Sequence, residues 1–245
     1  MAKRIPLIKL DVPEAIVLDS SEQWIKEVYQ EADAKTAEKF GSNSLAYKTI
    51  TNGIDREDII GSQFFWNTNL GFYLPKGRKV CLLNDWEEIN DLDESFFRGF
   101  YTDSPQIILR TDTLSYDRNK YILENLVKQV KKQGFEFSSE NPLIISNLEL
   151  VKDDNSDNGY GLLINIGKDT TLANDKRFAY SNSGKLILFG DKTKVVYNKE
   201  KDLSRVGLGW DGDLGARGGL LDVSSGIGRV VVWDTGGVAP KKLNF

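Results

Sequence analysis

Two segments of the chain have the amphipathic spacing of an α-helix. In residues 21–40 the apolar side chains recur on one helical face, and Ser20 and Gln23 have the spacing of a capping box at its start. In residues 115–133 apolar side chains stand at i, i+3, i+4 and i+7, and lysines occupy the last turns. A glycine follows each segment, as is common at helix ends. We predict that these segments form the two main helices.

The chain between these helices has a less regular pattern. Residues 42–62 mix glycine, asparagine and charged side chains, which indicates a long loop. Residues 63–74 are rich in aromatic side chains, which favour strands, so we predict a bent strand or a hairpin around Asn67–Asn69. Residues 84–94 are acidic but carry an apolar side chain at every third position, which indicates a short surface helix.

Beyond residue 138 the pattern changes to short apolar segments separated by polar turns. The predicted strands are residues 143–151, 161–166, 186–189, 194–197, 206–210 and 229–233. This arrangement predicts an α+β fold. Residues 1–137 would form a mixed α/β part with the two main helices, and residues 138–245 a β-rich, largely antiparallel part. One continuous domain is the alternative.

Histidine is absent from the 245 residues, and Cys81 is the single cysteine. Without imidazole the chain has no Ser-His-Asp or Cys-His nucleophile, no histidine-bound zinc and no histidine proton shuttle. One cysteine cannot form an intramolecular disulfide or a cysteine metal cage. Catalysis would have to use carboxylates, lysine, tyrosine, hydroxyl groups or a bound cofactor, and the sequence predicts no cofactor.

The charge of the chain bears on its partners and location. The chain has 36 acidic and 32 basic residues, and an acidic balance does not favour nucleic-acid binding, which depends on neutralising phosphates. No run of about 18 apolar residues is present, so we expect no membrane partner. The basic N-terminus is not followed by an apolar stretch typical of a signal peptide. We therefore expect a soluble protein in the cytoplasm, or in a particle assembled there.

Glycine is concentrated near the C-terminus, where Gly209, Gly212, Gly215 and Gly218 recur at every third residue. The segment 207–212 also spells G-x-G-x-x-G, but no helical pattern follows it, so a nucleotide site is not favoured. Glycine-rich turns between short strands account for the spacing, and such turns can present polar groups to a partner. The candidate ligand-binding or partner-binding residues are Trp210, Asp211, Asp213 and Arg217.

A second candidate site begins at Asp154. The sequence from Asp154 reads D-x-S-x-N-G, which places the side-chain oxygens of Asp154, Ser156 and Asn158 at positions 1, 3 and 5, like the start of a calcium loop. Position 12 is Asn165, where an EF-hand needs glutamate. These three residues are therefore candidate ligands for a weakly bound divalent cation, and an exposed polar turn is the alternative.

These observations favour a non-catalytic binding or assembly protein that acts through its β-rich, glycine-rich C-terminal half. Its partner would be another protein or a second copy of the chain. A small ligand or a carbohydrate remains an alternative, because aromatic clusters can stack on sugars. A metal-dependent or carboxylate-based hydrolase of the nuclease or glycosidase type is the main competing function, since the chain has many acidic residues.

Overall fold

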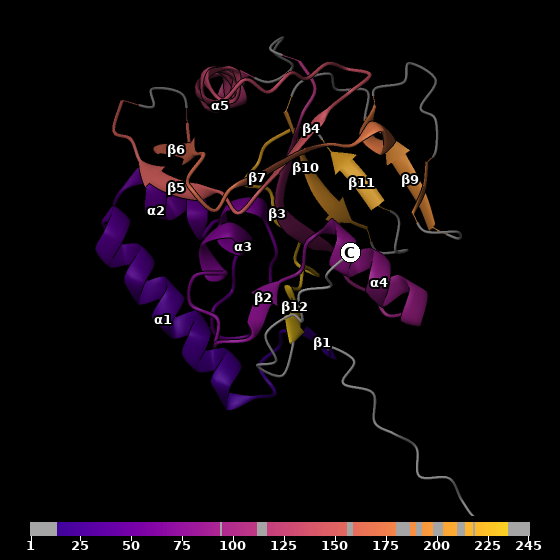
Figure 1. Ribbon diagram of the computed structural model, residues 1–245. Helices are drawn as coiled ribbons and strands as arrows, with labels where there is room; N and C mark the ends of the chain where they lie inside the picture. The colour runs from indigo at the N-terminus through magenta and orange to yellow at the C-terminus, as the bar shows by residue number, and fades with distance from the viewer. Residues whose placement is uncertain are drawn as a thin grey trace, which may run out of the picture.

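The protein has an α+β fold, as the sequence predicts, with helices concentrated in its N-terminal half and antiparallel strands in its C-terminal half (Figure 1). The computed structural model describes residues 14–93, 95–111, 117–155, 159–179, 187–189, 193–197, 203–209, 214–217 and 219–234. The α-helices in this part of the chain are α1 (Gln23–Phe40), α2 (Leu45–Ile50), α3 (Phe64–Leu70), α4 (Leu83–Leu92) and α5 (Lys120–Lys132). Within the same ranges, no helix is both long and apolar enough to cross a membrane.

A seven-stranded sheet forms the centre of the fold. Its strand order is β7 (Thr171–Asn174), β4 (Leu143–Ser146), β3 (Thr102–Leu109), β10 (Leu203–Leu208), β11 (Leu214–Arg217), β9 (Thr193–Tyr197) and β8 (Ile187–Phe189). Its neighbouring strands are antiparallel except for the parallel pair β11 and β9. Strand β3 lies before residue 138 in the chain, whereas its neighbours in the sheet, β4 and β10, lie after that residue. The sheet therefore contains strands from both predicted parts of the chain.

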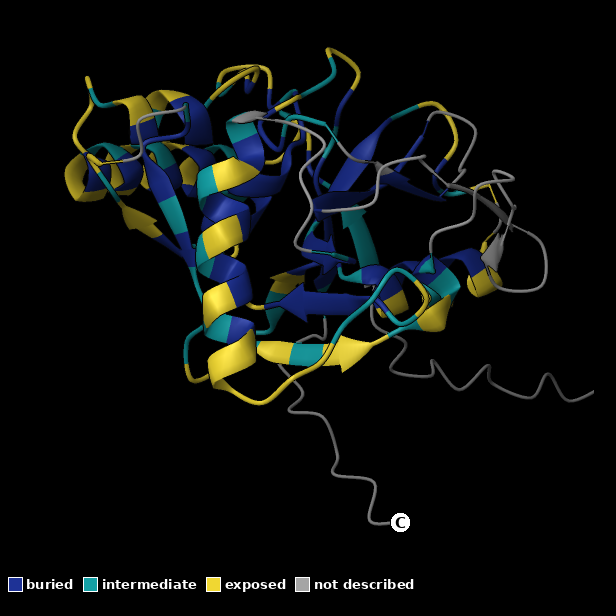
Figure 2. Cartoon of the chain, turned by 90° about the horizontal axis from the view of Figure 1, so that it is seen from above, coloured by how far each residue is buried: buried dark blue, intermediate teal, exposed yellow. Residues whose placement is uncertain are grey.

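Two smaller sheets complete the β-structure. One has the order β1 (Glu14–Val17), β12 (Val231–Asp234) and β2 (Arg78–Val80), and it joins the start of the described chain to its end. The other is the hairpin of β5 (Glu149–Lys152) and β6 (Leu162–Asn165). Helix α5 packs on β6, and Figure 2 shows buried and exposed residues alternating along that helix. This alternation is what its amphipathic spacing predicts.

The two main helices are confirmed, but the predicted cap of the first is wrong. The N-cap residue of α1 is Glu22, whose side chain makes no capping hydrogen bond. At the other end of the helix, Gly41 follows with φ +86°. Ser20 and Gln23 do not form a capping box, because the chain before the helix turns through a hydrogen bond from the Ser21 amide to Asp19. Helix α5 is preceded by a 3-10 turn, η1 (Asp117–Asn119).

Two predictions for the segment between the main helices are wrong. The predicted loop contains α2, whose N-terminus is capped by the Ser44 hydroxyl accepting from the Tyr47 amide. The aromatic stretch forms helix α3, not a strand or hairpin, and Gln63 caps it by accepting from the Phe65 amide. All seven residues of α3 are buried. A helix buried on every side has no polar face, so the sequence shows no helical periodicity there.

The middle of the central sheet is buried on both faces, since successive side chains of a strand point to opposite sides and all residues of β4 and β10 are buried. On β3, Ile107 and Leu109 belong to a core with residues of α1, α3 and α5. Ile108 belongs to a second core, where it joins Trp86 and Ile89 of α4. Figure 1 shows α1 and α4 on opposite sides of the molecule. Helix α3 packs on β3, β5, α1 and α2, which places its polar residues near the centre of the first core.

Candidate functional site

A cavity of about 280 Å³ lies beside the buried helix α3. We call it the α3 cavity. Helix α3 and the turn after it form one wall, β2 and the start of α4 form another, and β3 and the loops after β4 and β6 close it. The residues that line it are Asn67, Thr68, Gly71, Phe72, Lys79, Val80, Leu82, Pro105, Asn147, Leu148 and Asp169. Its volume is close to the lower end of the range for small-molecule sites, roughly 300–1,000 Å³.

Asn67 is the buried polar residue of the cavity wall. Its Nδ2 donates to the Ser62 hydroxyl at 2.9 Å and to the Asp103 carbonyl at 2.6 Å. The carbonyl can only accept, so the amide of Asn67 must keep its nitrogen on that side. Its Oδ1 is buried and has no hydrogen-bond partner among the described residues. Leaving such a group unsatisfied costs about 1–3 kcal/mol. Because Asn67 has no exposed surface, this oxygen is out of reach of a ligand in the cavity.

Lys79 brings a positive charge to the same cavity. It lies in β2, and its side chain is half exposed. The ammonium group pairs with Asp85 at 2.7 Å, and the other oxygen of Asp85 accepts from the Leu82 amide at the start of α4. Asp85 therefore holds the lysine side chain beside the wall. An ammonium group has three N–H donors, so this pairing leaves donors for a ligand.

The opposite rim is a loop fixed by hydrogen bonds. Asn147 has φ +56°, the left-handed conformation that asparagine tolerates better than most residues. The Thr170 hydroxyl donates to the Asn147 carbonyl at 3.0 Å and accepts from the Gly167 amide at 2.9 Å. These bonds fix the loop that places the exposed residue Asp169 at the rim. The cavity thus combines an apolar lining with one cationic residue, one anionic residue and the neutral polar residues Asn67, Thr68 and Asn147.

A second group of buried polar residues lies between β3, β10 and the loop after β11. We call Tyr101, Asp103 and Arg205 the Asp103–Arg205 cluster. Asp103 is fully buried, pairs with Arg205 at 2.8 Å and accepts a hydrogen bond from the Tyr101 hydroxyl. Arg205 also donates to the Val223 carbonyl at 2.7 Å. Gly207 stands opposite Asp103, where a Cβ atom would lie 2.8 Å from its carboxylate.

A neighbouring ion pair anchors the same loop. Arg118 pairs with the buried carboxylate of Asp222 at 3.0 Å and donates to the Gly159 carbonyl. Its guanidinium group lies 4.5 Å from the ring centre of Tyr160, whose hydroxyl donates to Asn119. Burial raises the pKa of Asp222 even though Arg118 lowers it. Both buried carboxylates are therefore bound to arginines that hold the fold together, and neither lines the α3 cavity.

The glycine-rich segment is largely internal where the structure describes it. Gly207 and Leu208 belong to β10, and Leu214, Gly215 and Ala216 to β11, all of them buried. Arg217 ends β11 opposite Arg205. Of the other candidate partner-binding residues, Trp210, Asp211 and Asp213 lie outside the described residues. The predicted partner site on this segment stays a prediction.

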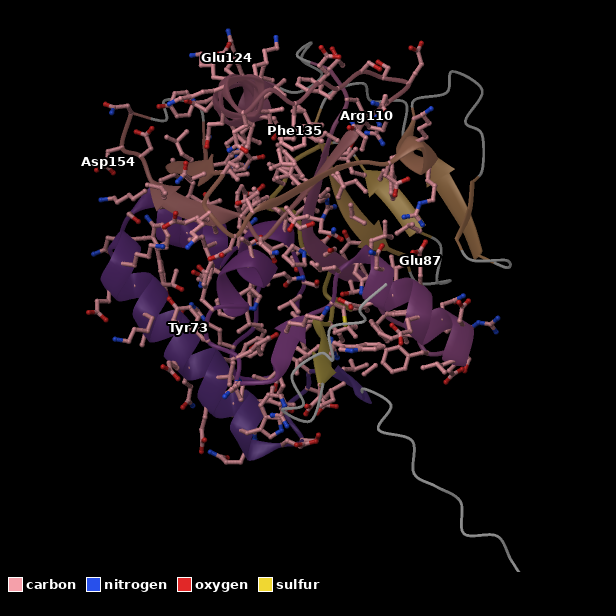
Figure 3. The ribbon with its side chains drawn as sticks, in the orientation of Figure 1. Tyr73, Glu87, Arg110, Glu124, Phe135 and Asp154 are labelled. Atoms are coloured by element: carbon pink, nitrogen blue, oxygen red, sulfur yellow. The ribbon has the colours of Figure 1, made fainter. Side chains whose placement is uncertain are left out.

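The candidate cation site is described only at Asp154, since Ser156 and Asn158 lie outside the described residues. The Asp154 side chain is 80% exposed and pairs with Lys152 at 3.2 Å. Figure 3 shows it at the outer edge of the molecule. Its neighbour Asp153 accepts from the Asn155 amide and from the Tyr121 hydroxyl, which lowers the pKa of Asp153. Across the described ranges, no three His, Cys, Asp or Glu residues are grouped so that they could hold a metal ion.

A larger and more open cavity, of about 660 Å³, lies at the end of β3. Arg110 and Phe135 both line it, and Figure 3 shows them next to each other. The guanidinium group of Arg110 is buried and donates to the Phe178 carbonyl at 2.8 Å and to the Ser204 hydroxyl at 2.6 Å. These bonds tie β3 to β10 and to the 3-10 turn at Lys176–Phe178, so the arginine has a structural role.

The residues of the α3 cavity give little signal in the sequence. Asn67 falls in the predicted hairpin turn, where a polar residue is ordinary and gives no sign of a site. Lys79 directly follows Arg78 and Asp169 directly follows Lys168, so neither charge stands out from its neighbours. Gln63 directly before an apolar run is one usable signal, since a polar residue there can cap a helix. A helix over residues 64–70 places Asn67 as an amide among apolar neighbours.

Comparison of the chain with protein-family models, with curated proteins and with solved structures finds no match.

Proposed function

We propose that this protein is a non-catalytic binding protein and that the α3 cavity holds a small ligand. The observation that carries the proposal is a cavity whose lining is mostly apolar and includes two side chains of opposite charge, Lys79 and Asp169. Binding sites for small molecules commonly combine an apolar lining with a few polar groups that orient the ligand. The cavity draws residues from both halves of the chain, so its shape depends on the complete fold.

The proposal keeps the non-catalytic function expected from the sequence but moves its support to another part of the molecule. The described glycine-rich residues form buried strands, whereas the α3 cavity is open to a ligand. A protein partner for the C-terminal half, or self-association, remains a second expectation. The hydrolase alternative has less support, because Asp103 and Asp222 are each bound to an arginine.

Phe72 offers a direct test of the proposed site. It lines the cavity and is 64% exposed. Leu92 at the end of α4 is also 64% exposed and does not line the cavity, so it provides a matched control. A library of small compounds would be screened by ligand-observed NMR against the wild type, Phe72→Ala and Leu92→Ala.

We expect compounds that bind the wild type and Leu92→Ala equally and bind Phe72→Ala about tenfold more weakly, because the aromatic ring supplies apolar contact area. Tryptophan fluorescence provides a second readout, because Trp66, one of the five tryptophans, precedes Asn67 in α3. A screen without binders, or binders that are insensitive to Phe72, would contradict the proposal.

A further inference from the structure

The polar groups of the α3 cavity differ in charge, and this difference restricts the ligand. Lys79 supplies an ammonium group and Asp169 a carboxylate. The remaining lining is mostly apolar and comes from Phe72, Val80, Leu82, Pro105 and Leu148. A purely apolar ligand would leave both charged groups without a partner in the ligand, and a ligand of one charge would face a residue of its own sign.

We infer that the α3 cavity binds a small zwitterion with an apolar body, of the kind represented by a free apolar α-amino acid. The inference rests on the proposed function and names its substrate class. The ammonium group of such a ligand donates to the Asp169 carboxylate. Its carboxylate accepts from Lys79, and its side chain contacts the apolar lining.

The surroundings of each charged group support this assignment. Asp85 neutralises part of the Lys79 charge, which suits a ligand with no net charge better than a strong anion such as a phosphate. Asp169 is held at the rim by the bonds of Thr170 to Asn147 and Gly167. A volume of about 280 Å³ accommodates a ligand of amino-acid size and is small for a nucleotide.

Calorimetry with the whole protein can test the inference using probes that differ in one charge. L-leucine carries both charged groups, 4-methylpentanoate lacks the ammonium group, and 3-methylbutylamine lacks the carboxylate. L-methionine and L-phenylalanine test the apolar part, and L-serine is the polar control. We expect at least one of the three apolar amino acids to bind, and both leucine analogues to bind about tenfold or more weakly than leucine, because each loses a charge-assisted hydrogen bond.

Two substitutions connect each charge to its residue. Lys79→Gln should weaken the binding of leucine and of 4-methylpentanoate but not that of 3-methylbutylamine. Asp169→Asn should weaken the binding of leucine and of the amine but not that of the acid. Lys152→Gln and Asp154→Asn are matched controls, because this exposed pair lies outside the cavity. A general loss of folding would weaken every probe alike, so the selective pattern separates recognition from structural damage.

The outcomes distinguish this inference from the proposed function. If the two analogues bind as tightly as leucine, or if no apolar amino acid binds while other compounds bind in a manner sensitive to Phe72, the zwitterion inference is overturned and the small-ligand function stands. If neither the amino acids nor the screened compounds bind, both fail. Selective loss at Lys79 and Asp169 supports both.

Discussion

The α3 cavity and the Asp103–Arg205 cluster both contain residues of opposite charge, but these residues differ in exposure. Asp103 binds Arg205 and Tyr101 and is fully buried. Lys79 and Asp169, which line the α3 cavity, are exposed. The two regions are adjacent, since Asn67 donates to the Asp103 carbonyl.

This difference indicates where the protein uses polarity for stability and where for binding. Buried charges that are paired resist substitution, because removing one partner leaves the other uncompensated. Exposed charged residues that line a cavity contribute little to stability, and their charged groups can bind a ligand. Substitutions in the two regions should therefore separate stability from ligand binding.

The largest expected effect is at Asp103. Asp103→Asn leaves the buried charge of Arg205 without its carboxylate, and we expect a loss of about 3–5 kcal/mol in the free energy of unfolding. Asp169→Asn removes an exposed carboxylate and should change stability by less than about 0.5 kcal/mol. Urea unfolding followed by tryptophan fluorescence measures both. Equal stability of the two variants would contradict the structural role of the cluster.

A smaller effect is expected from the close approach of β10 to β3. A Cβ atom at Gly207 would lie 2.8 Å from the Asp103 carboxylate and 3.0 Å from the Tyr101 hydroxyl. Gly207→Ala should therefore cost about 1–3 kcal/mol of stability through overpacking. Gly167→Ala is the control, because nothing lies within 4 Å of the added carbon. If thermal unfolding shows the same midpoint for both variants, the contact between Gly207 and the cluster is not tight.

The smallest effect concerns the pH dependence of Asp222. Because burial raises the pKa of Asp222 in the folded protein, the folded state takes up a proton at a higher pH than the unfolded state. This residue therefore contributes more to stability as the pH falls from 7 towards its ordinary value of 3.8. Asp222→Asn lacks this contribution, so the wild type should gain stability relative to the variant between pH 7 and pH 4. Urea unfolding at both pH values tests the sign, and a relative loss would show that pairing with Arg118 dominates.

Much of the fold followed from periodicity. The main helices α1 and α5 have one buried and one exposed face, so their spacing alone identified them. Strands β4, β8, β9 and β10 of the central sheet overlap predicted strands, because short apolar segments with polar turns indicate strands. Strands β7 and β11 were missed, because β7 is mostly exposed and β11 is built around Gly215 and Ala216, which give little strand signal.

The candidate site could not be predicted in the same way. Its polar groups come from α3, β2 and the loop after β6, segments that are distant in the sequence. Each residue alone has an ordinary setting, and the site exists only through their convergence. The candidates drawn from local motifs at Asp154 and Trp210 depended instead on consecutive residues.

The amino-acid sequence by itself determined the α+β class, the two amphipathic helices and the absence of imidazole chemistry, because these depend on local periodicity and composition. Only the tertiary structure decided that residues 64–70 form a helix, since that segment is buried on all sides and its environment comes from distant parts of the chain. The same holds for the α3 cavity. Whether a polar atom is satisfied depends on neighbours that only folding brings within hydrogen-bond distance.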